Sequence, residues 1–213
     1  MNMRDEVLQR SMPSVMAPKF EALVPLEAFG ERLLVATNGV FLEVSRPWIS
    51  LVRKIANYDV QTAVPYGVVE ETTTLRCPGL PADLVQAFVA MARHALPNET
   101  AGWIVWNVAT RTFRLVAARL IVHTPDFLSY EPPRLERDEV LVMDCHSHAV
   151  DRAFFSPTDN KDDRWDVKFA LVVGNCDLPV PSLALRLCAK GLIDEVERLP
   201  AYLHVTPSMG SMQ

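Results

Sequence analysis

The sequence contains few cysteines, and none of them stand close together. Its 213 residues include four cysteines with no Cys-x-x-Cys pair among them: Cys77, Cys145, Cys176 and Cys188. This scatter excludes a disulfide-stabilised secreted scaffold and a zinc site built from cysteines. We therefore expect reduced thiols in a cytoplasmic protein.

The sequence also lacks a surplus of positive charge and a long apolar run. The formal net charge is −5, and no cluster of Lys and Arg stands out. This balance argues against binding to nucleic acid or to an anionic membrane. No apolar stretch approaches the roughly 20 residues that cross a bilayer, and residues 1–20 lack the apolar core of a signal peptide. We expect neither a nucleic acid nor a membrane as a partner.

What is present is the composition of a globular protein with a sizeable core, since 49% of the residues are hydrophobic and 22% are charged. The strongest break in the chain is CPGLP, at residues 77–81. We place a domain boundary there. The resulting prediction is a flexible lead-in over residues 1–20, an N-terminal α+β domain of unknown role over 21–78, and a second domain over 79–213.

Local patterns predict several elements. Two β-rich runs flank Asn38-Gly39 and predict a hairpin over residues 32–44. Pro47, followed by apolar residues at helical spacing, predicts a helix that begins there. The sequence also predicts an extended segment over residues 64–75 and a helix over 81–96. Residues 97–123 predict two strands around a turn at 109–111, and residues 138–148 and 167–175 predict two buried strands. The segment from 183 onwards fits a strand or a short helix.

A pair of histidines follows the strand predicted at 138–148. His146 and His148 are two residues apart, so at a strand end both side chains point to one face. Downstream, Ser156-Pro157-Thr158-Asp159 is typical of a helix N-terminus, with Ser as the cap and Asp in the first turn. Two histidines and one aspartate form a three-ligand zinc set whose fourth position is left to water, as in catalytic zinc sites.

A hydrolytic zinc site also needs a general base that takes the proton from the attacking water. Glu99, in the segment PNETAGW at the start of a predicted strand, is our candidate.

The complete pattern, Glu…His-Ser-His-x7-Ser-x2-Asp, resembles the zinc motif of the JAMM metalloproteases, the catalytic branch of the JAB/MPN domains. A narrower resemblance covers most of the chain and is to protein A of the PRTRC (ParB-related, ThiF-related cassette) systems of bacterial plasmids. It is carried by RPWISLVRKIA, VPYG, PNETAGWIVWN, DCHSHAVDRAFFSPTDNKDD and LRLCAKG. The resemblance implies an α/β (α+β) fold: a mixed, cytidine-deaminase-like β-sheet flanked by helices, preceded by a small α+β region.

The resemblance also implies roles for individual residues. One Zn²⁺ per chain would be held by His146, His148 and Asp159. Glu99 would act as general base and later protonate the leaving amine, while Ser156 would help to hold the oxyanion. The implied reaction is hydrolysis of a peptide or isopeptide bond in the C-terminal tail of a ubiquitin-like β-grasp protein. That protein and a ThiF/E1-like protein of the same cassette would be the partners.

Three other functions stand beside this one. A non-catalytic MPN scaffold is the first alternative, although such scaffolds have lost ligands that this sequence keeps. An amidase acting on a small amide or on a carrier-linked amino acid is the second. A cytidine deaminase would need His-x-Glu or Cys-x-Glu and a later Pro-Cys-x-x-Cys, and the sequence has neither.

Weaker candidates surround the motif. Asp144 shares a strand face with His146 and is a candidate to orient an imidazole, although a solvent-exposed or turn role fits as well. Ser147, between the two histidines, is a similarly weak candidate for supporting the ligands. Asp162 and Asp163 lack the spacing of a calcium-binding loop, so we expect them to face solvent. Ala149 stands where many eukaryotic members of the family have proline.

Overall fold

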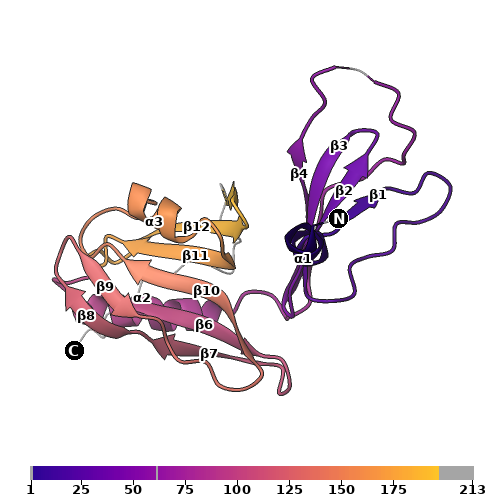
Figure 1. Ribbon diagram of the computed structural model, residues 1–213. Coiled ribbons are helices and arrows are strands. Elements are labelled where there is room, and N and C mark those ends of the chain that lie inside the picture. The colour runs from indigo at the N-terminus through magenta and orange to yellow at the C-terminus, as the bar shows by residue number, and fades with distance from the viewer. Residues whose placement is uncertain (1, 61, 197–213) are drawn as a thin grey trace. The chain divides into compact units, whose positions relative to one another are not determined.

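A computed structural model of the protein describes residues 2–60 and 62–196 (Figure 1). The chain divides into two compact units, Met1–Pro78 and Gly79–Gln213, and this division falls within the CPGLP segment. The last 17 residues of the second predicted domain, 197–213, lie outside the described part of the chain. None of the described helices is both long and apolar enough to span a bilayer.

The first unit contains a five-stranded sheet and one helix, α1 (Met3–Ser11). Its strands are hydrogen-bonded in sequence order: β1 (Ser14–Met16), β2 (Gly30–Ala36), β3 (Gly39–Ser45), β4 (Ile49–Ala56) and β5 (Thr72–Leu75). Strand β1 is parallel to β2, and the other pairs are antiparallel. The predicted hairpin is confirmed, since β2 and β3 join at Asn38-Gly39.

Residues 1–20, predicted as a flexible lead-in, contain helix α1, which Asn2 caps, and strand β1, which pairs with β2. One prediction for this unit is wrong. The helix predicted from Pro47 is strand β4. There, Ile49 and Leu51 are fully buried and alternate with more exposed neighbours. This alternation is the period of a strand with one face on the core, and it outweighs the helical spacing that also fits these residues.

The second unit is built on a six-stranded sheet in the order β13-β12-β11-β10-β6-β7. Its elements, in chain order, are α2 (Ala82–Ala95), β6 (Ala101–Asn107), β7 (Thr112–Ala117), β8 (Arg119–His123), β9 (Leu128–Glu131), β10 (Glu139–Ser147), α3 (Pro157–Asp162), β11 (Val167–Gly174), β12 (Ser182–Ala189) and β13 (Leu192–Glu195). Strands β8 and β9 form a separate two-stranded sheet. The mixed α+β fold is therefore confirmed. The described part of the segment from 183, which the sequence left open, contains strands β12 and β13.

The centre of the sheet positions the histidines. Strands β10 and β11 are its one parallel pair among the described strands, and the crossover between them carries α3. Helix α2 packs across β6, β7 and β10 through a buried face formed by Val85, Phe88, Val89 and Ala92 (Figure 1). A parallel connection must leave one end of the sheet and return to the other. The crossover therefore brings α3 past the carboxyl end of β10, where His146 lies.

Candidate metal centre

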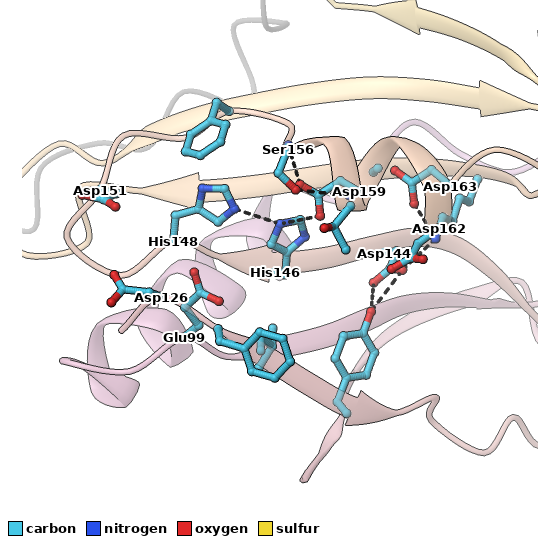
Figure 2. Close-up of a pocket in the computed structure, with 17 residues that line it drawn as sticks. Glu99, Asp126, Asp144, His146, His148, Asp151, Ser156, Asp159, Asp162 and Asp163 are labelled. Atoms are coloured by element: carbon cyan, nitrogen blue, oxygen red, sulfur yellow. Dashed lines mark hydrogen bonds and ion pairs between the residues drawn. The ribbon is translucent and has the colours of Figure 1, made fainter. Parts of the chain in front are cut away.

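Three side chains, from β10, the segment just after it and α3, converge at the carboxyl end of β10 (Figure 2). The Nε2 atoms of His146 and His148 are 3.2 Å apart, and His146 Nε2 is 3.4 Å from Asp159 Oδ1. One ligand atom from each residue lies within 4.8 Å of the other two. These three residues are the set that the sequence pattern selected.

The backbone after β10 turns sharply and so aims the second imidazole. The amide of His148 donates to Val173 of β11 (2.8 Å), which continues the strand pairing, and the amide of Asp151 then donates back to His148 (2.8 Å). Between them, Ala149 is buried and has φ = 44°. Proline, whose φ is fixed near −65°, cannot adopt this conformation. A proline at position 149 would therefore require a different backbone here.

Gly174, at the end of β11, has no Cβ atom, and the segment that follows the histidines therefore packs directly against its backbone. A Cβ atom at this position would overlap backbone atoms of Asp151 and Ala153. The amide of Ala153 also donates to Ser182 Oγ (2.8 Å), which anchors the same segment to β12. The loop that leads from His148 to α3 is thereby held against the sheet.

Asp159 is oriented by the start of α3. Ser156 caps this helix, and its Oγ accepts from the Asp159 amide (3.2 Å), while Asp159 Oδ2 accepts from the Ser156 amide (2.6 Å). This reciprocal capping box holds one carboxylate oxygen and leaves Oδ1 directed at His146. The hydroxyl proton of Ser156 is not used in the box, so the cap remains able to donate to a substrate oxygen.

The distances from His146 to the other two residues are those of ligands in a tetrahedral zinc site. Zinc binds histidine nitrogen and carboxylate oxygen at about 2.0–2.2 Å, so two ligands at a tetrahedral angle lie about 3.3 Å apart. The two separations that involve His146, 3.2 and 3.4 Å, match this value, and all three ligand atoms lie within 4.8 Å of one another. Burial, followed by the proximity of His146, lowers the pKa of His148. The neutral imidazole that a metal requires is therefore the favoured form.

Glu99 lies immediately before β6 and borders the same pocket. Its amide donates to Thr124 (3.0 Å), and the residue is 9% exposed. Burial, followed by the negative charges of Asp159, Asp126 and Asp151, raises the pKa of Glu99 from 4.5 to about 7. A carboxyl group that titrates near neutrality is suited to accept and return a proton.

Ser147 supports the segment that carries Glu99 and not the imidazoles. It is completely buried, and its Oγ accepts from the Thr100 amide (2.9 Å), while its own amide donates to the Thr100 carbonyl (2.9 Å). Strand β10 is thus joined to the residue next to Glu99. The histidines and the candidate base are held in register by this pair of hydrogen bonds.

Asp144 does not orient either imidazole through any hydrogen bond of the described residues, so this prediction is wrong. Its carboxylate accepts from Lys168 Nζ (2.8 Å) and from the Tyr130 hydroxyl (3.1 Å). Alternation placed Asp144 correctly on the face of His146. However, the carboxylate forms its ion pair with Lys168 of the neighbouring parallel strand β11 and not with the histidines.

The prediction that Asp163 faces solvent is also wrong. It is 6% exposed and binds Lys168 Nζ (2.8 Å) and Arg186 Nη2 (2.6 Å). Arg186 also donates to Asn160 Oδ1 (2.5 Å). Sequence reasoning missed this network, although a charged residue within each of two apolar strands, β11 and β12, was a signal for it, because such residues are buried only when paired. The network fastens α3, and with it Asp159, to the sheet.

We expect Asp163→Asn to destabilise the second unit at neutral pH, by about 3–5 kcal/mol or roughly 10 °C in Tm, because two buried cations lose a partner. Burial alone would raise the pKa of Asp163, but Lys168 and Arg186 outweigh it and lower the pKa. The stabilisation is therefore present above the unfolded pKa and is lost as pH falls through the folded one. Thermal unfolding at pH 7, 5 and 3 should show a difference that shrinks with acidity.

The exposed neighbour provides the control for this measurement. Asp162→Asn removes the same charge one residue away and should change Tm by less than about 2 °C. Equal effects of the two substitutions at pH 7 would contradict the assigned role of Asp163.

The converging residues border a cavity of about 310 Å³. The segment between β8 and β10 forms part of its wall through Asp126, Phe127, Leu128 and Tyr130. Seven of the lining residues are Asp or Glu, and one, Lys168, is a Lys or Arg. The cavity is therefore strongly acidic.

Comparisons with known proteins divide the chain at the same place. Residues 81–187 match the family model of prokaryotic homologs of the JAB domain, and residues 2–76 match a domain of unknown function, DUF2016. No curated protein matches the chain. A solution structure of protein DSY2949 from Desulfitobacterium hafniense is similar, with 19% identity and a TM-score of 0.41 over 55% of this chain and 88% of that one.

Proposed function

The chain belongs to the family of prokaryotic homologs of the JAB domain, and on this premise we propose that it is a zinc-dependent peptidase or isopeptidase of the JAMM type. The observation that carries the proposal is the convergence of His146, His148 and Asp159, whose ligand atoms lie within 4.8 Å of one another, in a cavity that Glu99 also borders. A scaffold has no need to preserve such spacing together with a carboxyl group whose pKa is near 7.

The chain's own residues supply the proton transfers. When bound, zinc would provide Lewis acidity that lowers the pKa of water and polarises a carbonyl group. Glu99 takes a proton from the attacking water and returns it to the leaving amine, so the same carboxyl serves as base and then as acid. The Ser156 hydroxyl donates to the oxygen that becomes negative in the tetrahedral intermediate.

The substrate that we propose is the extended C-terminal tail of a ubiquitin-like β-grasp protein, encoded in a PRTRC cassette together with a ThiF/E1-like protein. This part rests on the resemblance of the sequence to PRTRC protein A. The two-stranded sheet of β8 and β9 supports it, because Leu128 and Tyr130 of β9 border the cavity. An extended tail can bind by adding a strand to such a sheet edge.

The test is to incubate the zinc-loaded protein with the cassette's β-grasp protein that carries a C-terminal extension. Mass spectrometry should detect release of the extension by the wild type. A set of short peptides without the β-grasp fold is included, and cleavage of the peptides alone would favour the small-amide alternative. If several extensions stay intact with stoichiometric zinc present, the proposed peptidase activity on this substrate is wrong.

A further inference from the structure

Two carboxylates at the cavity have no role in holding the metal ligands. Asp126, between β8 and β9, and Asp151, after the histidines, are both exposed and border the cavity. Neither has an ion pair or a side-chain hydrogen bond within residues 2–60 and 62–196. Figure 2 shows both on the side of His148 that faces away from His146, with Asp126 the nearer of the two to Glu99 in this view.

Glu99 adds a third carboxyl group without a cationic partner at this place. It is nine-tenths buried, its carboxylate borders the cavity, and no described side chain donates to it. The interactions that act on it come from Asp159, Asp126 and Asp151, all of the same sign. A cleft lined by charges of one sign concentrates its field and attracts a counter-charge from solution.

The attracted cation is larger than a metal ion. Among the described residues, His146, His148 and Asp159 are the one group of three or more side chains whose ligand atoms converge closely enough to hold an ion. Asp126, Asp151 and Glu99 do not converge in this way. The cavity's own cation, Lys168, is already bound by Asp144 and Asp163.

The walls beside these carboxylates suit a long aliphatic stem. Phe127, next to Asp126, is 58% exposed, and Phe154, whose ring packs edge-on against His148 at 4.5 Å between centroids, is 52% exposed. Lysine and arginine side chains bury their methylene groups along apolar surface and keep the charged group outside. Aromatic faces also attract that charged group.

We propose that Asp126 and Asp151 form a subsite for a lysine or arginine side chain on the leaving-group side of the scissile bond. The position follows from Glu99, which borders the same cavity as the two carboxylates and which, in the proposed function, protonates the leaving amine. This inference rests on the proposed function. It adds that the enzyme selects substrates whose released fragment is positively charged close to the new amino terminus.

Binding of two labelled peptides tests the subsite directly. The peptides are fluorescein-labelled octapeptides that differ only at two central positions, Lys-Arg in one and Gln-Met in the other. Fluorescence anisotropy with the zinc-loaded wild type should show at least about fivefold tighter binding of the cationic peptide at low salt. The preference should fall below about twofold in 0.5 M salt, because salt screens the attraction between the cationic peptide and the two carboxylates.

Substitutions localise the effect. Asp126→Asn and Asp151→Asn should each reduce the preference about two- to threefold, and the double variant should remove it. Asp138→Asn is the matched control, since this exposed residue lies just before the far end of β10 and has φ = 67°, which asparagine tolerates. It should leave the preference unchanged.

Cleavage measured in the same samples separates this inference from the proposed function. Hydrolysis without any charge preference overturns the subsite and leaves the peptidase intact. If the wild type prefers the cationic peptide, the double variant does not, and no substrate is hydrolysed, the cation site is supported. The proposed peptidase activity and the assignment of the site to the leaving-group side are then wrong. Equal binding of both peptides, undetectable binding of both, or a preference that survives in the double variant overturns the subsite.

Discussion

Replacing His146 with alanine should leave the purified protein without stoichiometric zinc. The substitution removes the imidazole that lies closest to both other ligands, at 3.2 Å from His148 Nε2 and 3.4 Å from Asp159 Oδ1. Loss of an outer hydrogen-bond partner typically weakens a metal site 10–100-fold, so loss of a direct ligand should cost at least about 100-fold. Elemental analysis and competition with a chromogenic chelator measure the occupancy and the affinity.

The fold should survive this change, because the His146 side chain faces the cavity and is only partly buried. His94→Ala is the matched control, since His94 is exposed on α2 and its contact is with a carbonyl of its own helix. It should retain one zinc per chain. If His146→Ala bound zinc as tightly as His94→Ala, the metal centre would have to lie elsewhere. A wild type without zinc would favour the scaffold alternative.

The positions of the three metal-binding side chains could be predicted from patterns of neighbouring residues in the sequence. Alternation along β10 puts His146 and His148 on one face, and Ser156-Pro157 begins a helix that fixes Asp159. These rules need only neighbouring residues. Agreement between strand period, capping and ligand chemistry at one place made the prediction specific.

The tertiary parts could not be predicted in the same way. Lys168 and Arg186 bind Asp163 across 5 and 23 residues of chain, and nothing in the local pattern selects that partner over solvent. Strand β4 was mistaken for a helix because Ile49, Val52 and Ile55 fit a helical spacing as well as part of a strand. The neighbouring strands β3 and β5 decide between these possibilities. Such partners become visible only in the folded chain.

Replacing Glu99 with glutamine should separate two properties that His146→Ala removes together: metal content stays at the wild-type level while turnover falls. Glutamine keeps the size and one oxygen of the side chain but neither accepts nor returns a proton in the reaction. General acid–base catalysis contributes about 10²–10⁴-fold, so we expect a loss of that order in kcat/KM on whichever fusion the wild type cleaves. Glu27→Gln, an exposed glutamate in the first unit, provides the control and should retain both properties.

The stability of the same variant distinguishes lost chemistry from a damaged fold. Burial and three nearby carboxylates raise the pKa of Glu99 from 4.5 to about 7. A carboxyl group with a raised folded pKa makes the zinc-free protein less stable as pH increases from 4.5 towards 7, because the folded state holds the proton that the unfolded state releases. Neutral glutamine removes this penalty. Zinc-free Glu99→Gln should therefore melt at a higher temperature than the wild type at pH 8 and at nearly the same temperature at pH 4. A lower melting temperature at pH 8 would indicate that the side chain is structural, whereas a more stable, metal-competent and inactive protein is the outcome that a buried catalytic carboxyl requires.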